Sequence, residues 1–157
     1  MGIQDEVSVM RRIPLFAHID TKQLKLLAFT SERIVFEAEQ MLFRQGDDGD
    51  AAYVLLDGEA DVLVDAPSGP VPVARLGRNA IVGEIAILCD VPRTASIMAV
   101  SRLETVRITK AQFLGLLTES PQLAVEIMKI LAQRLARTSM ELSEARSQLK
   151  SQRGATS

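Results

Sequence analysis

The sequence is poor in the residues from which disulfides, metal sites and catalytic sets are most often built. It holds one cysteine, one histidine and no tryptophan among 157 residues. With Cys89 alone, no disulfide can form within the chain and no cysteine-based zinc cluster can be assembled. The single histidine, His18, lies in the helical N-terminal segment, where a capping or surface role is expected. We therefore expect no enzyme activity, no bound metal and no cofactor.

The chain also lacks a surplus of charge of either sign and any long apolar run. Lysine and arginine number 18, aspartate and glutamate number 20, and the formal net charge is -2. This balance leaves no basic excess for a phosphate backbone, so DNA is not expected as a partner. No segment approaches about 18 consecutive apolar residues, and the N-terminus has no apolar signal segment. We expect no membrane association and a cytoplasmic location.

What the chain does contain is enough apolar material for one folded domain. Hydrophobic residues make up 47% of it and charged residues 24%, as is typical of globular proteins. The spacing of the hydrophobic residues is typical of helices near the N-terminus, of strands in the middle of the chain and of helices again near the C-terminus. We expect a single domain over residues 1–150, with N-terminal helices in 5–30, a barrel over 33–109 and C-terminal helices over 110–150. A polar tail, residues 151–157, follows.

The middle of the chain is a series of short strand-like segments. They read "RIVFEA", "MLFRQ", "AAYVLLDGEADVLV", "PVPVARL" and "ASIMAVSRLETVRI", and the turn-forming stretches "QGDDGD", "DGE", "APSGP" and "LGRN" separate or interrupt them. Several short strands at this spacing predict an antiparallel barrel or jelly roll. We expect a mainly β fold with flanking helices, of a kind that often holds a small ligand.

The C-terminal part of the chain predicts an unusually long helix. After Ser120 and Pro121, about 30 residues, roughly 45 Å of helix, follow without glycine or proline until Gly154. Along this helix, residues alternate at spacings of three and four in a heptad pattern typical of paired helices. These positions are Met128, Leu131, Leu135, Thr138, Leu142, Ala145 and Leu149. We expect a homodimer through residues 128–149; the alternative is a helix lying apolar face down on the barrel.

Two hydroxyl residues interrupt this apolar face. Thr138 occupies a heptad position, and Ser139 is its neighbour. Thr138 can bond the carbonyl one turn back while Ser139 faces water. Alternatively, both can point at a polar ligand lodged between barrel and helix. The periodicity of the helix does not decide between these alternatives.

The segment "VGEIAILCDVPRTASI", residues 82–97, places charged groups in an apolar run. Gly83 permits a close backbone approach, and the amides at the start of a following helix suit a phosphate, over which Arg93 can close. Glu84 would repel that phosphate, so it should face a hydroxyl such as that of a ribose. The alternative is a buried ion pair between Glu84 and Arg93. Cys89, in the same segment, is expected to be a small packed hydrophobe.

This segment resembles the phosphate-binding cassette of cyclic nucleotide-binding domains. The resemblance lies in "GEIAIL", residues 83–88, followed by "PRTAS", residues 92–96. The flanking stretches "IPLFAHIDTKQLKLLA", "MLFRQGDDGDAAYVLLDGEADV" and "ARLGRNAIVGE" are similar to the N-terminal helices, early strands and cassette approach of that family. The similarity extends over residues 11–148.

The resemblance implies specific roles for the cassette residues. Glu84 would bind the ribose 2′-hydroxyl, and Arg93 would bind the exocyclic oxygens of the phosphate. The remaining implied ligand-binding residues of the cassette are Gly83, Ile85, Ala86, Thr94 and Ala95. Val82 departs from the Phe often found before the Gly-Glu pair, which should loosen packing there without removing a polar contact.

The stretch "LAQRLARTSMEL" resembles the dimer helix of the catabolite activator protein branch of this family. In that branch a Thr-Ser pair reaches the adenine amino group, with the Ser supplied by the partner subunit, and Thr138-Ser139 stands at the matching place. Thr94, next to Arg93, is also similar to the Thr that favours guanine in some relatives. We expect cAMP as the ligand, with cGMP as the alternative.

The resemblance implies a stand-alone receptor that moves or orders its C-terminal helix when it binds the nucleotide. Because the sequence ends at Ser157 without a helix-turn-helix, we expect its output to pass to an unidentified effector protein. The expected coupling surface is the last helix or residues 1–30. Two alternatives remain: an interaction scaffold that binds no nucleotide, and a regulatory fragment of a larger channel or transcription regulator.

Overall fold

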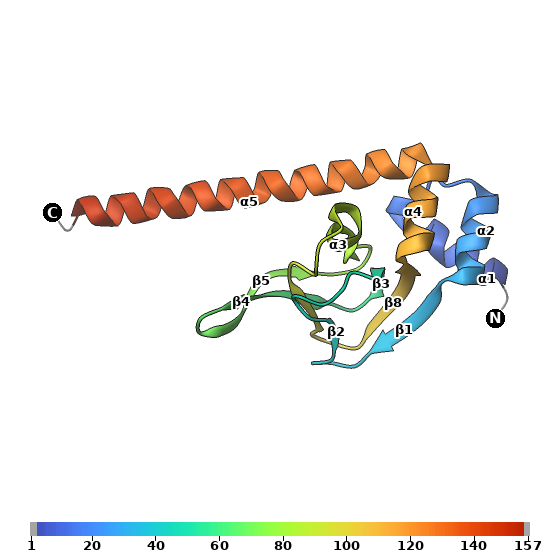
Figure 1. Ribbon diagram of the computed structural model, residues 1–157, viewed down its shortest axis with the longest axis horizontal. Coiled ribbons are helices and arrows are strands. Elements are labelled where there is room, and N and C mark those ends of the chain that lie inside the picture. The colour runs from blue at the N-terminus through green and yellow to red at the C-terminus, as the bar shows by residue number, and fades with distance from the viewer. Residues whose placement is uncertain (1–2, 156–157) are drawn as a thin grey trace.

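Eight strands form two four-stranded antiparallel sheets in the computed structural model, which describes residues 3–155. One sheet has the order β1-β8-β3-β6 and the other β2-β7-β4-β5. The strands are β1 Glu32–Phe36, β2 Met41–Phe43, β3 Ala51–Asp57, β4 Ala60–Ala66, β5 Gly69–Leu76, β6 Ile81–Val82, β7 Ser96–Ala99 and β8 Leu103–Thr109. The predicted jelly roll is confirmed (Figure 1).

The helices near the N-terminus and the first helix after β8 gather at one end of this barrel, the helix of the cassette lies beside the strands, and the last helix runs past them (Figure 1). They are α1 Ile3–Arg11, the 3-10 helix η1 Pro14–Phe16, α2 Thr21–Thr30, α3 Glu84–Cys89, α4 Lys110–Glu119 and α5 Pro121–Ala155. The step from β8 into α4 is fixed by a capping box, in which the Thr109 side chain accepts from the Gln112 amide and the Gln112 side chain accepts from the Thr109 amide. The helices predicted from the sequence are all present.

The central strand β3 separates two hydrophobic clusters. Alternate side chains of a strand point to opposite faces. Ala52 and Val54 therefore pack under the helical end of the molecule, while Ala51, Tyr53 and Leu55 pack between the two sheets. Because both faces are covered, the whole run from Ala51 to Leu55 is buried. This explains why the segment is continuously apolar instead of alternating.

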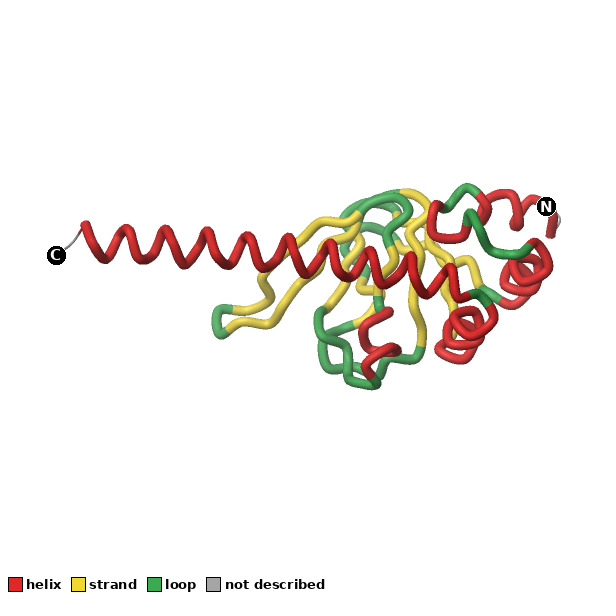
Figure 2. Tube along the Cα trace, turned by 90° about the horizontal axis from the view of Figure 1, so that it is seen from above, coloured by secondary structure: helices red, strands yellow, loops and turns green. Residues whose placement is uncertain are grey.

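Helix α5 contacts the domain only over its first part. Leu123 and Ile127 are buried, and Leu131 packs against the same cluster. Residues 135–153 are exposed, and the helix projects well beyond the barrel (Figures 1 and 2). The predicted long C-terminal helix is confirmed, and it continues into the segment expected to be a polar tail. None of the helices between residues 3 and 155 combines the length and apolarity needed to cross a bilayer.

One strand escaped prediction from the sequence. The sequence analysis expected no strand between the turn-forming stretch "LGRN" and the cassette, but Ile81 and Val82 form β6 and pair with Val54 and Tyr53 of β3. A two-residue strand is too short to show a period. This strand nevertheless matters, because it sets the position from which the cassette begins.

Candidate ligand-binding site

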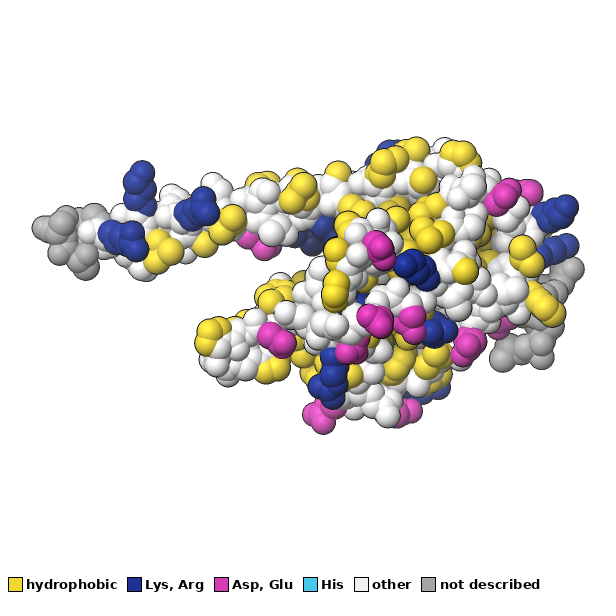
Figure 3. Space-filling view, viewed as in Figure 1, with side chains coloured by type: hydrophobic (Ala, Val, Ile, Leu, Met, Phe, Trp, Pro, Cys, Tyr) yellow, Lys and Arg dark blue, Asp and Glu magenta, His cyan; other side chains and the backbone are white. Residues whose placement is uncertain are grey.

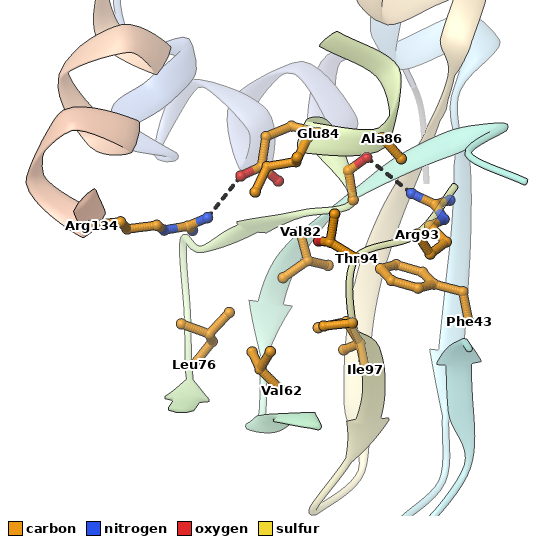
Figure 4. A pocket seen from close by; sticks show the side chains of 13 residues that line it. Phe43, Val62, Leu76, Val82, Glu84, Ala86, Arg93, Thr94, Ile97 and Arg134 are labelled. Atoms are coloured by element: carbon orange, nitrogen blue, oxygen red, sulfur yellow. Dashed lines mark hydrogen bonds and ion pairs between the residues drawn. The ribbon is translucent and has the colours of Figure 1, made fainter. Parts of the chain in front are cut away.

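A hollow lies between the cassette, the β2-β7-β4-β5 sheet and α5 (Figure 4). Its unfilled volume, counting the part open to solvent, is about 430 Å³. All seven cassette residues predicted to bind ligand line it: Gly83, Glu84, Ile85, Ala86, Arg93, Thr94 and Ala95. Apolar side chains from Phe43, Val62, Leu76, Val82 and Ile97 form the remaining walls, and Arg134 closes one side.

Gly83 makes the close approach that the sequence analysis expected of it. It precedes α3 with a φ of 88°, in the left-handed region that favours glycine. A Cβ at this position would lie 2.6 Å from Nη1 of Arg93 and 3.0 Å from the carbonyl oxygen of Ala51. No side chain fits there, so the backbone of the cassette can lie directly against the guanidinium.

The guanidinium of Arg93 is held on several sides. Its Nη1 donates to the carbonyl of Gly83 at 2.9 Å, and its Nη2 donates to the carbonyl of Ala51 at 2.6 Å. Nη2 also lies 3.5 Å from Oδ1 of Asp50, and the guanidinium carbon sits 3.9 Å above the centre of the Phe43 ring. These contacts fix the orientation of a cation whose side chain is only 2% exposed.

One donor of Arg93 remains unused. Its Nε is buried and, among the described residues, has no hydrogen-bond partner. An orphaned buried donor costs about 1–3 kcal/mol, more when it is charged. Burial also lowers the pKa of Arg93, while Asp50 opposes that shift. An anion in the pocket that Arg93 lines would stabilise the buried charge.

Glu84 pairs with a residue that the sequence analysis missed. Its carboxylate is 2% exposed and accepts from Nη1 of Arg134 at 2.7 Å, while Nη2 of Arg134 donates to the carbonyl of Ile81 at 2.9 Å (Figure 4). Burial raises the pKa of Glu84, although Arg134 and, more weakly, Arg93 pull it down. The alternative of a Glu84–Arg93 ion pair is wrong, because each residue has a different partner.

Thr138 and Ser139 lie outside this pocket. Both are exposed on α5, and Thr138 is one turn beyond Arg134 on the same face of the helix. In the part of the chain that the structure describes, Thr138 makes no hydrogen bond to the carbonyl of Arg134. The structure therefore brings seven of the nine predicted site residues together and leaves these two apart. Arg134 lies four residues before Thr138, on the same face of the helix, and this spacing was the signal in the sequence that could have identified Arg134.

The acidic turn before β3 braces the cassette. The Arg93 amide donates to the carbonyl of Asp47 at 2.8 Å, and the Gly46 amide donates to the carbonyl of Arg93 at 2.9 Å. Oδ2 of Asp50 accepts from Nη2 of Arg107 at 3.3 Å, so Asp50 lies between two arginines. A turn that the sequence marks only by its glycines and aspartates thus positions Arg93.

Cys89 does not occupy the packed position expected for it. It is the last residue of α3 and is exposed. The helix turns Ala86 and Ile87 into the interior, and Asp90, with a φ of 53°, ends it. The expectation is wrong because apolar neighbours in sequence do not show which face of a six-residue helix is covered.

The pocket combines three chemical features. A buried guanidinium with a free donor suits an anion, a buried carboxylate suits a hydroxyl donor, and the apolar walls suit a flat or aliphatic group. A ligand that carries all three groups within a few ångströms would match it. A nucleoside phosphate is such a molecule.

Comparisons with known proteins agree with this chemistry. The family model for the cyclic nucleotide-binding domain matches residues 33–120. Among solved structures, the chain is similar to the cyclic nucleotide-binding-like protein of Brucella abortus, with 32% identity and a TM-score of 0.61 over 73% of this chain and 98% of that one. It is also similar to the catabolite activator protein of Thermus thermophilus, with 27% identity and a TM-score of 0.72 over 83% of this chain and 62% of that one.

Curated relatives include the lysophospholipase nte1 of Neurospora crassa, which is 31% identical over 122 residues. That match covers 77% of this chain and 8% of the lysophospholipase, so this chain corresponds to a small part of a much longer protein. The family model covers more than half of the chain, and the Brucella structure is matched over nearly its whole length. The chain belongs to the family of cyclic nucleotide-binding domains.

Proposed function

We propose that this chain is a receptor for a purine cyclic mononucleotide, with cAMP preferred over cGMP. The observation that carries the proposal is the buried guanidinium of Arg93, which has an unpartnered Nε among the described residues and lines one pocket together with the buried carboxylate of Glu84. A cyclic nucleotide supplies one anionic phosphate and one ribose hydroxyl close together. Each charged group of the pocket would then meet the ligand group that it binds best.

The roles follow the arrangement of the cassette. Arg93 and the backbone at Gly83 and Ala86 would bind the phosphate, and Thr94 and Ala95 would complete that shell, with Ile85 beside it. Glu84 would accept from the ribose 2′-hydroxyl. Since Arg134 already holds Glu84, the ligand and α5 share one carboxylate. Binding at the cassette should therefore change the position of the helix.

The base would be bound from α5. Thr138 lies one turn beyond Arg134, and Ser139 would come from the partner subunit of a homodimer formed through residues 128–149. The exposure of Met128, Leu135, Leu142 and Leu149 supports this dimer, because isolated surface helices rarely expose such a stripe. A ligand bound between barrel and helix shifts the equilibrium between two positions of α5 only by the difference in its affinity for them.

The output of the receptor would pass to an effector protein in the cytoplasm. We assign the chain no catalytic role, no DNA contact and no membrane contact of its own. The surfaces that change when α5 moves are the helix itself and the N-terminal helices packed at its base, within residues 1–30. Regulation of a longer protein of which this domain forms a part would use the same surfaces.

Isothermal titration calorimetry with cAMP and cGMP tests the proposal. We expect wild type to bind cAMP more tightly than cGMP, and Arg93→Ala to lose about 10- to 100-fold in affinity, the value of one charge-assisted hydrogen bond. Arg75→Ala is the control, because Arg75 of β5 pairs with Asp61 of β4 and neither residue lines the pocket. Equal affinities for wild type and Arg93→Ala would refute the role of Arg93.

A second candidate is an interaction scaffold that binds no nucleotide. The observation in its favour is that both charged groups already have protein partners. Glu84 pairs with Arg134, and Arg93 contacts Gly83, Ala51 and Asp50. Thermal unfolding separates the candidates. A receptor with cAMP at 100 times its dissociation constant gains about 2.7 kcal/mol of stability, and a scaffold gains none.

A further inference from the structure

Helix α5 carries an apolar stripe that the domain does not cover. Met128, Leu135, Leu142 and Leu149 recur every seven residues and are between 52% and 68% exposed. Figure 3 shows hydrophobic side chains at the surface along the projecting helix, with charged side chains among them. A repeat of this kind is typical of a helix that pairs with another helix. The charged residues beside the stripe therefore bear on how two such helices would be arranged.

The residues beside the stripe have defined places in the heptad, whose positions are written a to g. The four stripe residues are at a, and Thr138 and Ala145 are at d. In a parallel pair of helices, the g residue before each a faces the e residue of the next heptad in the partner, and such pairs set orientation and register. Glu141 is at g, and Arg146 is at the e position of the next heptad.

Glu141 and Arg146 carry opposite charges that are unused within the chain. Both are exposed, and among the described residues neither has an ion-pair or hydrogen-bond partner. In a parallel pair in register, Glu141 of each protomer would face the partner's Arg146, and two-fold symmetry gives this contact twice. An antiparallel pair places g opposite g and e opposite e, so that these charges would not meet. The charges therefore favour the parallel arrangement.

The position of the domain is compatible with this arrangement. Ile127 and Arg134 are both at g; Ile127 is buried in the domain, and Arg134 pairs with Glu84. The e residues Ala132 and Ser139 are exposed. Because each g flank would face the partner's e flank, two-fold symmetry places the two domains on opposite sides of the helix pair. The domains therefore leave room for the partner helix along the stripe.

We propose that two copies of this chain pair in parallel and in register through α5, and that reciprocal ion pairs between Glu141 and the partner's Arg146 set this arrangement. The same register brings the partner's Ser139 opposite Arg134, on the side of the nucleotide pocket that Arg134 closes. The inference rests on the homodimer of the proposed function, and it adds the orientation, the register and the residues that set them. It does not depend on nucleotide binding.

Charge reversal tests the ion pairs by sedimentation equilibrium at low salt. Glu141→Arg alone, or Arg146→Glu alone, places like charges opposite each other at both contacts. Each should raise the dimer dissociation constant about 5- to 30-fold. Combining the two substitutions in one chain should restore the wild-type value. Glu144→Arg and Arg137→Glu make the same charge changes at position c, away from the seam, and should leave the dimer unchanged.

A mixture of the two single variants gives a second readout. With Glu141→Arg in one copy and Arg146→Glu in the other, both contacts again hold opposite charges, so a heterodimer should form in preference to either homodimer. Energy transfer between donor and acceptor labels on the two N-termini measures this preference. The preference should weaken as salt is added, because the charges are exposed.

Cross-linking tests the orientation. In a Cys89→Ser background, Leu149→Cys places one cysteine at an a position near the end of each helix. A parallel pair in register would bring the two cysteines face to face, within the Cα separation of about 4.4–6.8 Å that a disulfide spans, and oxidation should give a covalent dimer. An antiparallel pair would hold them at opposite ends. Met140→Cys, on the opposite face of the helix, is the control and should cross-link far more slowly.

Each readout can contradict the inference. Equal effects of Glu141→Arg and Glu144→Arg, or a charge swap that fails to restore the dimer, would overturn the ion pairs. Cross-linking of Met140→Cys as fast as that of Leu149→Cys would overturn the parallel arrangement. A wild type that stays monomeric would overturn the inference as a whole, and the occupant of the stripe would then be a different protein. A lack of cAMP binding in calorimetry would refute the receptor, while sedimentation still decides the pairing.

Discussion

Arg134 of α5 donates to the carboxylate of Glu84 at 2.7 Å, across 50 residues of sequence. Arg134 is also the last residue of α5, among those up to residue 153, that is not exposed. Beyond it the helix leaves the domain (Figure 2). The ion pair therefore marks the point at which the position of the free helix is tied to the cassette.

Removing Arg134 should leave Glu84 without its cationic partner. We expect Arg134→Ala to lower the free energy of unfolding by about 1–3 kcal/mol, the cost of an unpaired buried acceptor. This loss of stability is smaller than the loss expected on breaking a fully buried ion pair, because the Arg134 side chain is 35% exposed. Urea unfolding of the ligand-free protein measures it.

The double variant Glu84→Gln with Arg134→Ala separates this ion pair from general packing. If the two groups interact, its loss of stability should be smaller than the sum of the two single losses by roughly 1 kcal/mol or more. Strict additivity of the single losses would show that the ion pair contributes nothing.

Nucleotide affinity should fall as the pH is lowered through the raised pKa of Glu84. Only the ionised carboxylate accepts fully from a ribose hydroxyl, and burial makes it protonate above the ordinary glutamate range. Below that pKa the association constant should drop by about tenfold per pH unit. Calorimetry across a pH series measures the slope, and Glu84→Gln, which cannot titrate, should give a weak but flat profile. A wild-type profile as flat as that of Glu84→Gln would contradict the role of the carboxylate.

The raised pKa of Glu84 has the opposite effect on the stability of the ligand-free protein, which should increase as the pH is lowered. Since the folded pKa of Glu84 is raised, the folded state holds this proton more tightly than the unfolded chain does. The resulting stability is fully present below the unfolded pKa and is lost as pH rises through the folded pKa. Relative to Glu84→Gln, wild type should therefore gain stability on acidification. Paired urea titrations at neutral and acid pH measure the difference, and an unchanged gap between the two proteins would contradict it.

Much of the fold could be predicted because its signals are local. The strands from β1 to β8 other than β6 carry apolar runs between turn residues, and the length of α5 follows from the absence of glycine and proline between Pro121 and Gly154. Gly83 and Arg93 could be singled out for the same reason, since each is an anomaly within a short apolar segment. The structure places both at the pocket.

The parts that could not be predicted depend on contacts between distant segments. Arg134 looked like one more charge on a long helix, and only the docking of α5 on the cassette gives it Glu84 as a partner. Asp50 looked like a turn residue until the fold brought it beside Arg93. The exposure of Cys89 likewise depends on which side of α3 the barrel covers.

Gly83→Ala should damage the cassette more than a comparable change elsewhere. Gly83 and Gly46 have φ values of 88° and 91°, but only at Gly83 would a Cβ collide with Arg93 and Ala51; at Gly46 it would meet nothing within 4 Å. Both substitutions incur the left-handed backbone cost of about 1–3 kcal/mol. Gly83→Ala should lose about 1–3 kcal/mol more through overpacking. Chemical unfolding of the two variants gives the comparison, and equal losses would contradict the steric role of Gly83.

The free half of α5 should form a homodimer through one face only. Leu142 lies on the predicted heptad face and is 52% exposed, while Met140 is 65% exposed and lies about 200° away around the helix. An aspartate in a paired seam buries an unpaired charge. Leu142→Asp should therefore raise the dimer dissociation constant at least about a hundredfold, equivalent to roughly 2.7 kcal/mol. Met140→Asp places the same charge on the opposite face and should leave the dimer intact. Sedimentation equilibrium over a range of concentrations measures both, and the predicted seam is wrong if wild type is monomeric at high concentration or if the two variants dissociate alike.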